Sequence, residues 1–361
     1  MTKEIITMRP IIILFALLLA LTGCHSPTIK DEGEDLTGIP YHPKPYNLSI
    51  PKGLTPSPWL DDHILTEEGV LLGKYLFYDP ILSVDSTVSC ATCHRPAESF
   101  SGGKGKSRMA LTLLNVSYPR SGYGWDGRSK RLEEHISYML NSTMYLQLPD
   151  APLIQKRLIS TAYYPKMFRK AFGIQNTTEI NSKYIVAALS QFLNILLSGD
   201  SKYDKVVRGE MFFTPEEQDG ADMFFDANPL LPDAECAHCH IPPLFYSERF
   251  ANNGLDSVKN YRDFTDPGRG GITGISSDSG KFRIPTIRNV ALKSSFMHDG
   301  RLQSLEEVIQ FYNSGGHRFD NYSPFLHPLG LSEYQEHALL SFLQTLTDSK
   351  LRENPDIESP F

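Results

Sequence analysis

The sequence predicts a mainly α-helical fold built from two tandem domains. Helical periodicity of apolar residues dominates the 361 residues, and few segments show the alternation that is typical of strands. An ordered series of short motifs also occurs twice, and a repeat of this length indicates two related domains rather than a solenoid. We expect an N-terminal domain over 51–205, a C-terminal domain over 206–350 and a short tail over 351–361.

Five segments are predicted as helices from their apolar patterns and their ends. The first stops before Pro80, and the second is apolar enough to be a buried helix. Thr214 and Pro215 form a good helix start, as cap and first residue. Ser332 and Gln335 stand in capping-box positions. In chain order, these helices span 67–76, 184–197, 214–225, 302–311 and 332–346.

Each predicted domain contains one Cys-x-x-Cys-His run. The first run provides Cys90, Cys93 and His94, and the second provides Cys236, Cys239 and His240. In this pattern both thiols attach to the vinyl groups of one haem and the imidazole binds its iron, so the three side chains must share one short turn. A four-thiolate zinc site is the alternative, but it leaves both histidines unexplained. We therefore expect two c-type cytochrome domains, each around one covalently attached haem c.

The N-terminus predicts export and a lipid anchor. Lys3 and Arg9 precede an apolar run over 11–21, which is short for a bilayer span and is typical of a signal peptide. The small residues before Cys24 resemble a bacterial lipoprotein processing site. We expect a signal peptide over 1–23 and a lipid on Cys24. The alternative is an ordinary secretory signal with an incidental cysteine.

A lipid on Cys24 would attach the protein to the periplasmic side of a bacterial membrane. It also accounts for the odd cysteine count, because two pairs of the five cysteines hold haem and the fifth holds the anchor. His25, rather than Asp, follows Cys24, which favours the outer membrane. Residues 24–50 are rich in Pro, Gly and charge and are predicted to form a tether.

The formal net charge of −7 argues against a nucleic-acid partner. An acidic surface is compatible with a basic redox protein that long-range attraction steers towards it. We therefore expect a small redox protein as a partner. A homodimer is a separate prediction that does not rest on charge.

Several motifs resemble those of bacterial di-haem cytochrome c peroxidases and the related MauG proteins. The motifs are Leu76-Phe77-Tyr78-Asp79-Pro80, Trp125-Asp126-Gly127-Arg128, Asp266-Pro267-Gly268-Arg269, the segment 282–290, and Met297-His298-Asp299-Gly300-Arg301. The resemblance covers the chain from about residue 51 to about residue 346. It implies that the first haem reacts with hydrogen peroxide and that the second passes electrons or stores an oxidising equivalent.

The resemblance also assigns roles to residues around the predicted haems. It places Trp125 between the two haems, with ordinary core packing as the alternative. It implies a calcium ion held by the Asn115 side chain and by the backbone carbonyls of Arg283 and Pro285, which are ligands that a hard cation accepts. Asn115 could instead cap a turn.

The second iron needs a ligand on the face opposite His240. In the family that the motifs resemble, peroxidases of one kind place a Met there, and MauG-like members place a Tyr. The matching residue here is Tyr312, and Met297 is the alternative. A phenolate favours Fe(III) and higher oxidation states, so Tyr312 would not make the second haem a high-potential reservoir. The remaining alternative is that Tyr312 is a buried side chain that forms a hydrogen bond with the backbone.

The first half departs from the family pattern in two places. The loop 102–108 has no His that could block the first iron, and the segment 140–145 lacks the family's catalytic Glu. Cleavage of the peroxide O–O bond needs a group that moves a proton from one oxygen to the other. His135 could do this, could bind the iron itself, or could be a solvated or packing residue.

These patterns predict a di-haem c-type peroxidase that reduces hydrogen peroxide with electrons from a small cytochrome c or a cupredoxin. His135 and Trp125 are the expected catalytic residues. One alternative is a MauG-like enzyme that oxidises residues of a partner protein. The other is a non-enzymatic di-haem electron-transfer module, which would follow if His135 closed the first iron.

Overall fold

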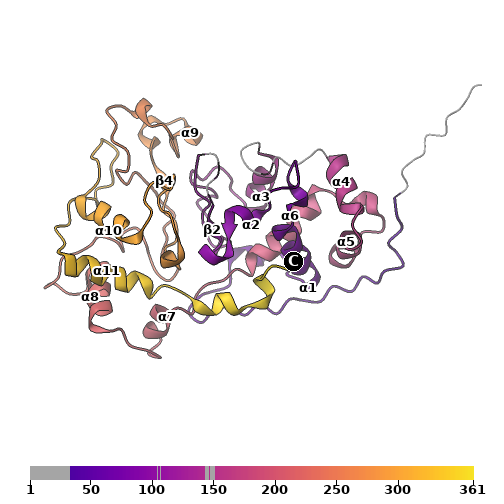
Figure 1. The fold of residues 1–361 in the computed structure, drawn as a ribbon, viewed down its shortest axis with the longest axis horizontal. Helices are drawn as coiled ribbons and strands as arrows, with labels where there is room; N and C mark the ends of the chain where they lie inside the picture. Colours follow the sequence, from indigo (N-terminus) through magenta and orange to yellow (C-terminus); the bar gives the residue numbers. More distant parts are fainter. Residues whose placement is uncertain (1–32, 104, 106, 143–145, 147–150) are drawn as a thin grey trace, which may run out of the picture. The chain divides into compact units, whose positions relative to one another are not determined.

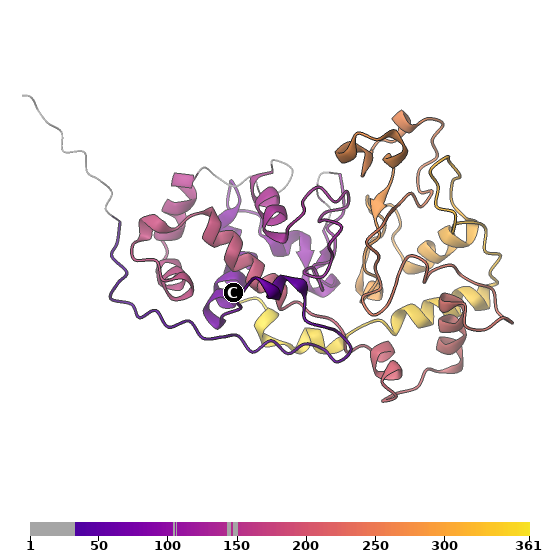
Figure 2. The same cartoon turned by 180° about the vertical axis from the view of Figure 1, so that it is seen from behind.

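The fold is mainly α-helical, as the sequence predicts (Figure 1). The computed structural model describes residues 33–103, 105, 107–142, 146 and 151–361, so the predicted signal peptide and Cys24 lie outside the described residues. Residues 34–361 form one unit, which Figure 2 shows from behind. Within the described ranges, no helix is long and apolar enough to cross a membrane.

Helices connected by long irregular segments make up most of this unit, together with two short antiparallel strand pairs. The helices are α1 (Glu67–Tyr78), α2 (Cys90–Cys93), α3 (Leu132–Asn141), α4 (Ala151–Ile159), α5 (Tyr164–Phe172), α6 (Ser182–Asn194), α7 (Lys202–Val207), α8 (Pro215–Phe225), α9 (Gly270–Thr273), α10 (Leu305–Ser314) and α11 (Glu333–Gln344). The strands are β1 (His94–Arg95), which pairs with β2 (Ser101–Gly102), and β3 (Phe250–Ala251), which pairs with β4 (Phe282–Arg283).

The five predicted helices are all present, as α1, α6, α8, α10 and α11, and their ends differ from the predicted ends by at most three residues. Thr214 caps α8 by accepting a hydrogen bond from the Glu217 amide, as expected from its position. The α10 helix starts later than predicted because Ser304 caps it: its hydroxyl accepts from the Glu307 amide at 3.1 Å. The sequence prediction did not include α4, α5 or α7.

The two halves use the same helix crossing. Helix α1 packs against α6, and α8 packs against α11. A Cβ on Gly73 would lie 2.0 Å from the carbonyl oxygen of Ala188, and a Cβ on Gly220 would lie 2.0 Å from that of Ala338. Each crossing therefore requires a glycine on the first helix, because any side chain would collide with the backbone of the second.

The repeat also includes a backbone contact just after the second helix of each pair, α6 in the first half and α11 in the second. Asn115 and Asn289 both adopt the left-handed conformation, with φ of 54° and 57°. The Asn115 amide donates to the carbonyl of Leu196 at 2.9 Å, and the Asn289 amide donates to that of Leu346 at 3.0 Å. The matching motifs in the two halves thus have matching local structures.

Two main clusters of buried apolar side chains correspond to these halves. The larger cluster surrounds α1 and α6, and the smaller one surrounds α8 and α11. Each cluster is lined by the helix pair that carries the crossing glycine. The structure thus provides each half with its own core.

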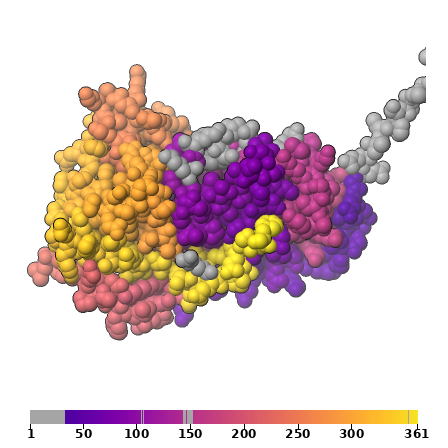
Figure 3. Space-filling view, viewed as in Figure 1, coloured from indigo at the N-terminus to yellow at the C-terminus, as the bar shows by residue number. Residues whose placement is uncertain are grey.

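The described parts of the predicted tether and tail are packed rather than free. Leu36 is buried in the first core, and its amide donates to the Gln175 carbonyl at 2.8 Å. Ile357 belongs to the same core, and Tyr46 donates to the Asp356 carboxylate at 2.6 Å. Figure 3 shows the yellow C-terminal residues lying against the purple part of the chain. Apolar residues within both polar segments account for this packing.

Candidate haem-binding cavities

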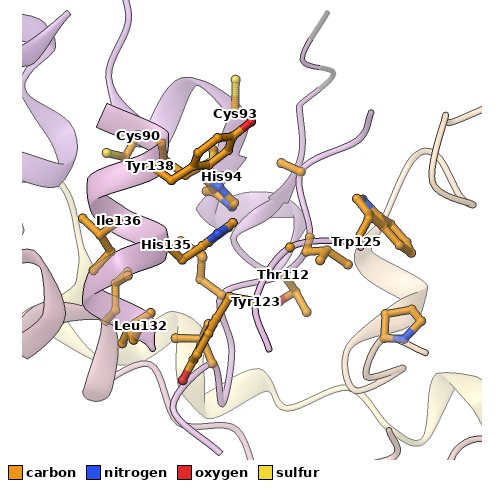
Figure 4. Close-up of a pocket in the computed structure, with 18 of the residues that line it drawn as sticks. Cys90, Cys93, His94, Thr112, Tyr123, Trp125, Leu132, His135, Ile136 and Tyr138 are labelled. Atoms are coloured by element: carbon orange, nitrogen blue, oxygen red, sulfur yellow. The ribbon is translucent and has the colours of Figure 1, made fainter. Parts of the chain in front are cut away.

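One cavity adjoins each Cys-x-x-Cys-His run. The first cavity has a volume of about 470 Å³, and the two thiols and the imidazole of the first run line it together with mainly apolar side chains (Figure 4). The second cavity has a volume of about 190 Å³ and is lined by the same three groups of the second run. The four cysteines of the two runs are free thiols. Each cavity therefore brings together the three side chains that the motif predicts for the attachment of one haem c.

The two motif histidines have hydrogen bonds and a charge state that suit a metal ligand. Nδ1 of His94 lies 3.1 Å from the carbonyl oxygen of Phe100, and Nδ1 of His240 lies 3.2 Å from that of Phe245. A ring that donates from Nδ1 presents the lone pair of Nε2 to a metal. Burial lowers the pKa of both histidines, so their imidazoles are neutral. The residues present thus fit the group that the motifs imply.

Trp125 and Arg283 are among the residues that line both cavities. Trp125 is 8% exposed, and its indole N–H donates to the backbone carbonyl of Met109 at 2.8 Å. Arg283 is buried and donates from Nη1 to the Gly122 carbonyl at 3.1 Å, while its Nε has no hydrogen-bond partner among the described residues. Burial lowers the pKa of the Arg283 guanidinium. An aromatic ring and a positive charge are therefore shared by the two sites.

Known proteins with related sequences identify the family. Residues 67–211 match the family model described as di-haem cytochrome c peroxidase. The chain is 31% identical to a methylamine utilization protein MauG of Methylorubrum extorquens, over 78% of this chain and 79% of that protein. The chain belongs to the di-haem cytochrome c peroxidase and MauG family. The prediction of this family, made from the motifs, is confirmed.

Further relatives include both kinds of protein. The family member described here is 29% identical to the cytochrome-c peroxidase IdrP2 of Denitromonas iodatirespirans, over 78% of this chain and 82% of that protein. A solved structure of a MauG-like protein associated with microbial copper homeostasis is 30% identical, with a TM-score of 0.77 and coverage of 87% of this chain and 99% of that chain. As a member of this family, the protein is an oxidoreductase, and the family implies two haem c groups.

His135 lies on the first cavity of this di-haem family member. It projects from α3, with its ring between those of Tyr123 and Tyr138 at centroid distances of 6.1 Å each (Figure 4). Nδ1 lies 3.3 Å from the Ser129 hydroxyl. Burial, helped by the nearby positive charge of Arg283, lowers the pKa of His135 to about 4. The imidazole is therefore neutral at pH 7 and can accept a proton.

The first cavity offers no free carboxylate among the described residues that line it. Its one carboxylate is Asp126, which accepts from Arg128 Nε at 2.9 Å and from Arg108 Nη1 at 2.6 Å. Glu133, on α3, accepts instead from the Trp59 indole at 2.6 Å. The segment 140–145, from which the sequence lacks the family's catalytic Glu, is only partly within the described residues.

Arg108 joins the two halves beside the first cavity, a pairing that the sequence motifs did not reveal. Its guanidinium contacts the Asp126 carboxylate and also that of Asp266 from the second half, with Nε to Oδ2 and Nη2 to Oδ1 distances of 2.6 Å. Burial alone would raise the pKa of both carboxyl groups, but the contacts with the arginine lower it overall. Both motifs that contain the two aspartates were recognised, but their spatial contact was not.

The predicted calcium ligands have other interactions in this structure. The Asn115 side chain donates to the Ser198 carbonyl at 2.9 Å and accepts from the Ser198 amide at 3.0 Å. It therefore fixes the segment after α6, as a turn-capping residue would. Arg283 and Pro285 line both cavities, and the Arg283 amide donates to the Trp125 carbonyl at 2.7 Å.

Both candidate ligands for the second iron line the second cavity. The side-chain nitrogen Nδ2 of Asn253 lies 3.3 Å from the Tyr312 hydroxyl and 3.4 Å from the Met297 sulfur. Burial raises the pKa of Tyr312 to about 12. Met297 adopts a left-handed backbone with φ of 68°. The sequence analysis missed Asn253, which holds the two alternatives side by side.

Proposed function

We propose that this oxidoreductase reduces hydrogen peroxide at the first cavity and receives electrons through the second. In this proposal the domains over 51–205 and 206–350 each hold one haem c, with His94 and His240 as iron ligands. The observation that carries the proposal is a neutral imidazole, His135, on the same cavity as His94. A proton acceptor on the peroxide site is what O–O bond cleavage requires.

His135 would move one proton between the two peroxide oxygens, taking it from the oxygen near the first cavity's iron and giving it to the leaving oxygen. When bound, haem supplies the iron and the electrons that cleave the bond. The overall reaction joins hydrogen peroxide, two protons and two electrons to give two waters. Arg128 places a guanidinium on the same cavity, where positive charge would stabilise the negative charge that develops on the leaving oxygen until His135 protonates it.

Trp125 would carry electrons between the cavities, since it lines both of them. Its ring lies 6.3 Å from that of Phe282 and 6.4 Å from that of His298. Small periplasmic electron carriers, either a cytochrome c or a cupredoxin, are the proposed donors. The acidic net charge of −7 supports a basic donor.

The test is steady-state peroxide reduction with a reduced small cytochrome c as donor. We expect His135→Ala to lower the rate of peroxide reduction by about 10²–10⁴-fold, the usual contribution of a general acid–base group. His337→Asn changes an exposed histidine on α11 and is the matched control. Full activity of the His135→Ala protein with intact haem spectra would contradict the proposal.

A second candidate is a MauG-like oxidation of residues in a partner protein. It is favoured by Tyr312 on the second cavity and by the MauG and MauG-like relatives at 31% and 30% identity. For this function, peroxide would be consumed without a reduced cytochrome when the partner is present, and the partner would gain an oxidative mass change. Turnover that depends only on the reduced cytochrome would argue against it.

The same proposal includes a periplasmic location with a lipid on Cys24, attachment to the outer membrane, a calcium ion near Asn115, and a homodimer. Mass spectrometry of the mature chain tests the lipid and the two haems together. Calcium analysis by plasma emission tests the calcium ion, and sedimentation equilibrium tests the homodimer.

A further inference from the structure

A mixed cluster of carboxylates and imidazoles lies at the edge of the second cavity. Ligand atoms of Asp233, Glu235 and His238 all lie within 4.8 Å of one another. His327 joins them from a segment far along the chain, with Nε2 at 3.4 Å from Glu235 Oε1. None of these four residues belongs to the haem-attaching set. Glu235 and His327 line the second cavity beside that set.

The distances suit a small cation. Glu235 Oε2 lies 2.8 Å from His238 Nδ1, and Glu235 Oε1 lies 3.4 Å from His327 Nε2. Bonds of about 2.0–2.1 Å in a tetrahedral zinc site place the ligand atoms roughly 3.3 Å apart. Asp233, Glu235 and His238 are already grouped, and a rotation of the His327 side chain towards them would complete a set of two nitrogens and two oxygens around one ion.

The fold holds several of these groups in position. Glu235 adopts a left-handed backbone with φ of 58°, and its amide donates to Asp233 Oδ1 at 2.7 Å. The His238 ring stacks on that of Phe325 with a centroid distance of 4.5 Å. His327 Nδ1 lies 3.0 Å from the Pro328 carbonyl. A ring that donates from Nδ1 to a carbonyl keeps the Nε2 lone pair available, as metal-binding histidines do.

We propose that these four residues form a binding site for a divalent transition metal, Zn²⁺ or Cu²⁺, distinct from the haems. Imidazole nitrogens with carboxylate oxygens suit these ions, whereas Ca²⁺ and Mg²⁺ prefer oxygen ligands alone. His238 lies between the two thiols of the second run, so the bound ion would stand beside the second haem attachment. Its positive charge would raise the reduction potential of that haem.

The experiment uses the di-haem holoprotein, purified without a histidine tag and treated with EDTA. Calorimetric titration with ZnCl₂ should show one ion bound per chain. His238→Asn and His327→Asn should each weaken zinc binding at least tenfold. His337→Asn, at an exposed position on α11, should bind zinc as the unaltered protein does. Haem absorption spectra of all variants establish that maturation is intact.

A second readout does not depend on heats of binding. Zinc should shift the midpoint potential of the second haem to a more positive value in the unaltered protein and in His337→Asn, but not in His327→Asn. Absence of zinc binding to the unaltered protein would overturn the proposal and leave the cluster as ion pairs. Equal zinc affinity in all the variants would also overturn it, because the ion would then be bound elsewhere. A competition titration with CuSO₄ shows which of the two ions, Cu²⁺ or Zn²⁺, binds this site more tightly.

Discussion

At the scale of single residues, burial decides which groups can exchange protons. His135 and the two motif histidines are all held neutral by burial, but Nδ1 of each motif histidine lies beside a backbone carbonyl, whereas Nδ1 of His135 lies 3.3 Å from the Ser129 hydroxyl. That hydroxyl can donate or accept. This leaves His135 free to change its protonation state during a reaction, which the two iron ligands are not.

The pH dependence of peroxide reduction should follow the lowered pKa of His135. Its pKa of about 4 lies below the usual 6.5, so the imidazole stays able to accept a proton above pH 4 and loses that ability as the pH falls through 4. We expect kcat/KM to be level from pH 5 to pH 7 and to fall below pH 4. An acid limb with a midpoint near 6.5 would contradict this. Haem spectra at each pH separate loss of activity from unfolding.

Arg283 should influence both haems, because its buried guanidinium lines both cavities. Removing a positive charge favours the more oxidised iron, so Arg283→Gln should lower both midpoint potentials. Potentiometric titration followed by absorption spectra measures the two potentials separately. Arg262→Gln, at an exposed position, is the control and should leave both unchanged. A shift of one potential alone would show that the charge acts on a single site.

At the scale of secondary structure, the glycine crossings fix how each helix pair meets. An alanine in an open helix position would be favourable by about 1 kcal/mol relative to glycine. At Gly73 and Gly220 an alanine would instead be unfavourable, because the added carbon would meet a backbone oxygen that cannot move independently of its helix.

Gly220→Ala should therefore lower the free energy of unfolding by about 1–3 kcal/mol, the usual cost of overpacking. Chemical denaturation of the holoprotein, followed by haem absorption, measures it. Gly38→Ala is the control, since no atom lies within 4 Å of the added carbon and its φ is not left-handed. Equal stability of the two variants would show that α8 and α11 can separate without cost.

The helices that were predicted are those with clear signals at their ends. Thr214 with Pro215, and Ser332 with Gln335, mark α8 and α11 within one residue of their observed starts. Helix α5 was missed although Pro165 stands in its first turn and Gly173 ends it with φ of 72°. Those end signals and the amphipathic pattern of its nine residues were all present in the sequence, so α5 could have been predicted.

At the scale of the whole unit, contacts between distant segments complete both sites. The motif histidines could be predicted because their function depends on residues within one turn. Asn253 could not be linked to Tyr312, nor Arg108 to Asp266, because these pairs are 59 and 158 positions apart. A single sequence contains no local signal for such contacts. The motifs therefore predicted candidate iron ligands, whereas the structure was needed to find the residues that surround them.

The Arg108 junction should make stability depend on acid. The pKa of Asp266 is lowered in the folded protein, so its contribution is complete above the unfolded value of about 4 and is lost as the pH falls through the lower folded value. Asp266→Asn should cost roughly 1.5–3 kcal/mol at pH 7, and this cost should shrink as the pH falls below about 4. Thermal unfolding across this range tests it, with Asp320→Asn at an exposed position as control. A pH-independent difference would contradict the assignment.

The indole of Trp125 donates to the Met109 carbonyl, an oxygen that cannot take up a proton near neutrality. On losing an electron, the ring would therefore keep its hydrogen and become a radical cation rather than a neutral radical. The oxidation potential of that couple does not vary with acidity. Charge could then cross between the two iron sites with the same ease in an acidified periplasm as in a neutral one, and a solvent isotope effect on this transfer should be absent.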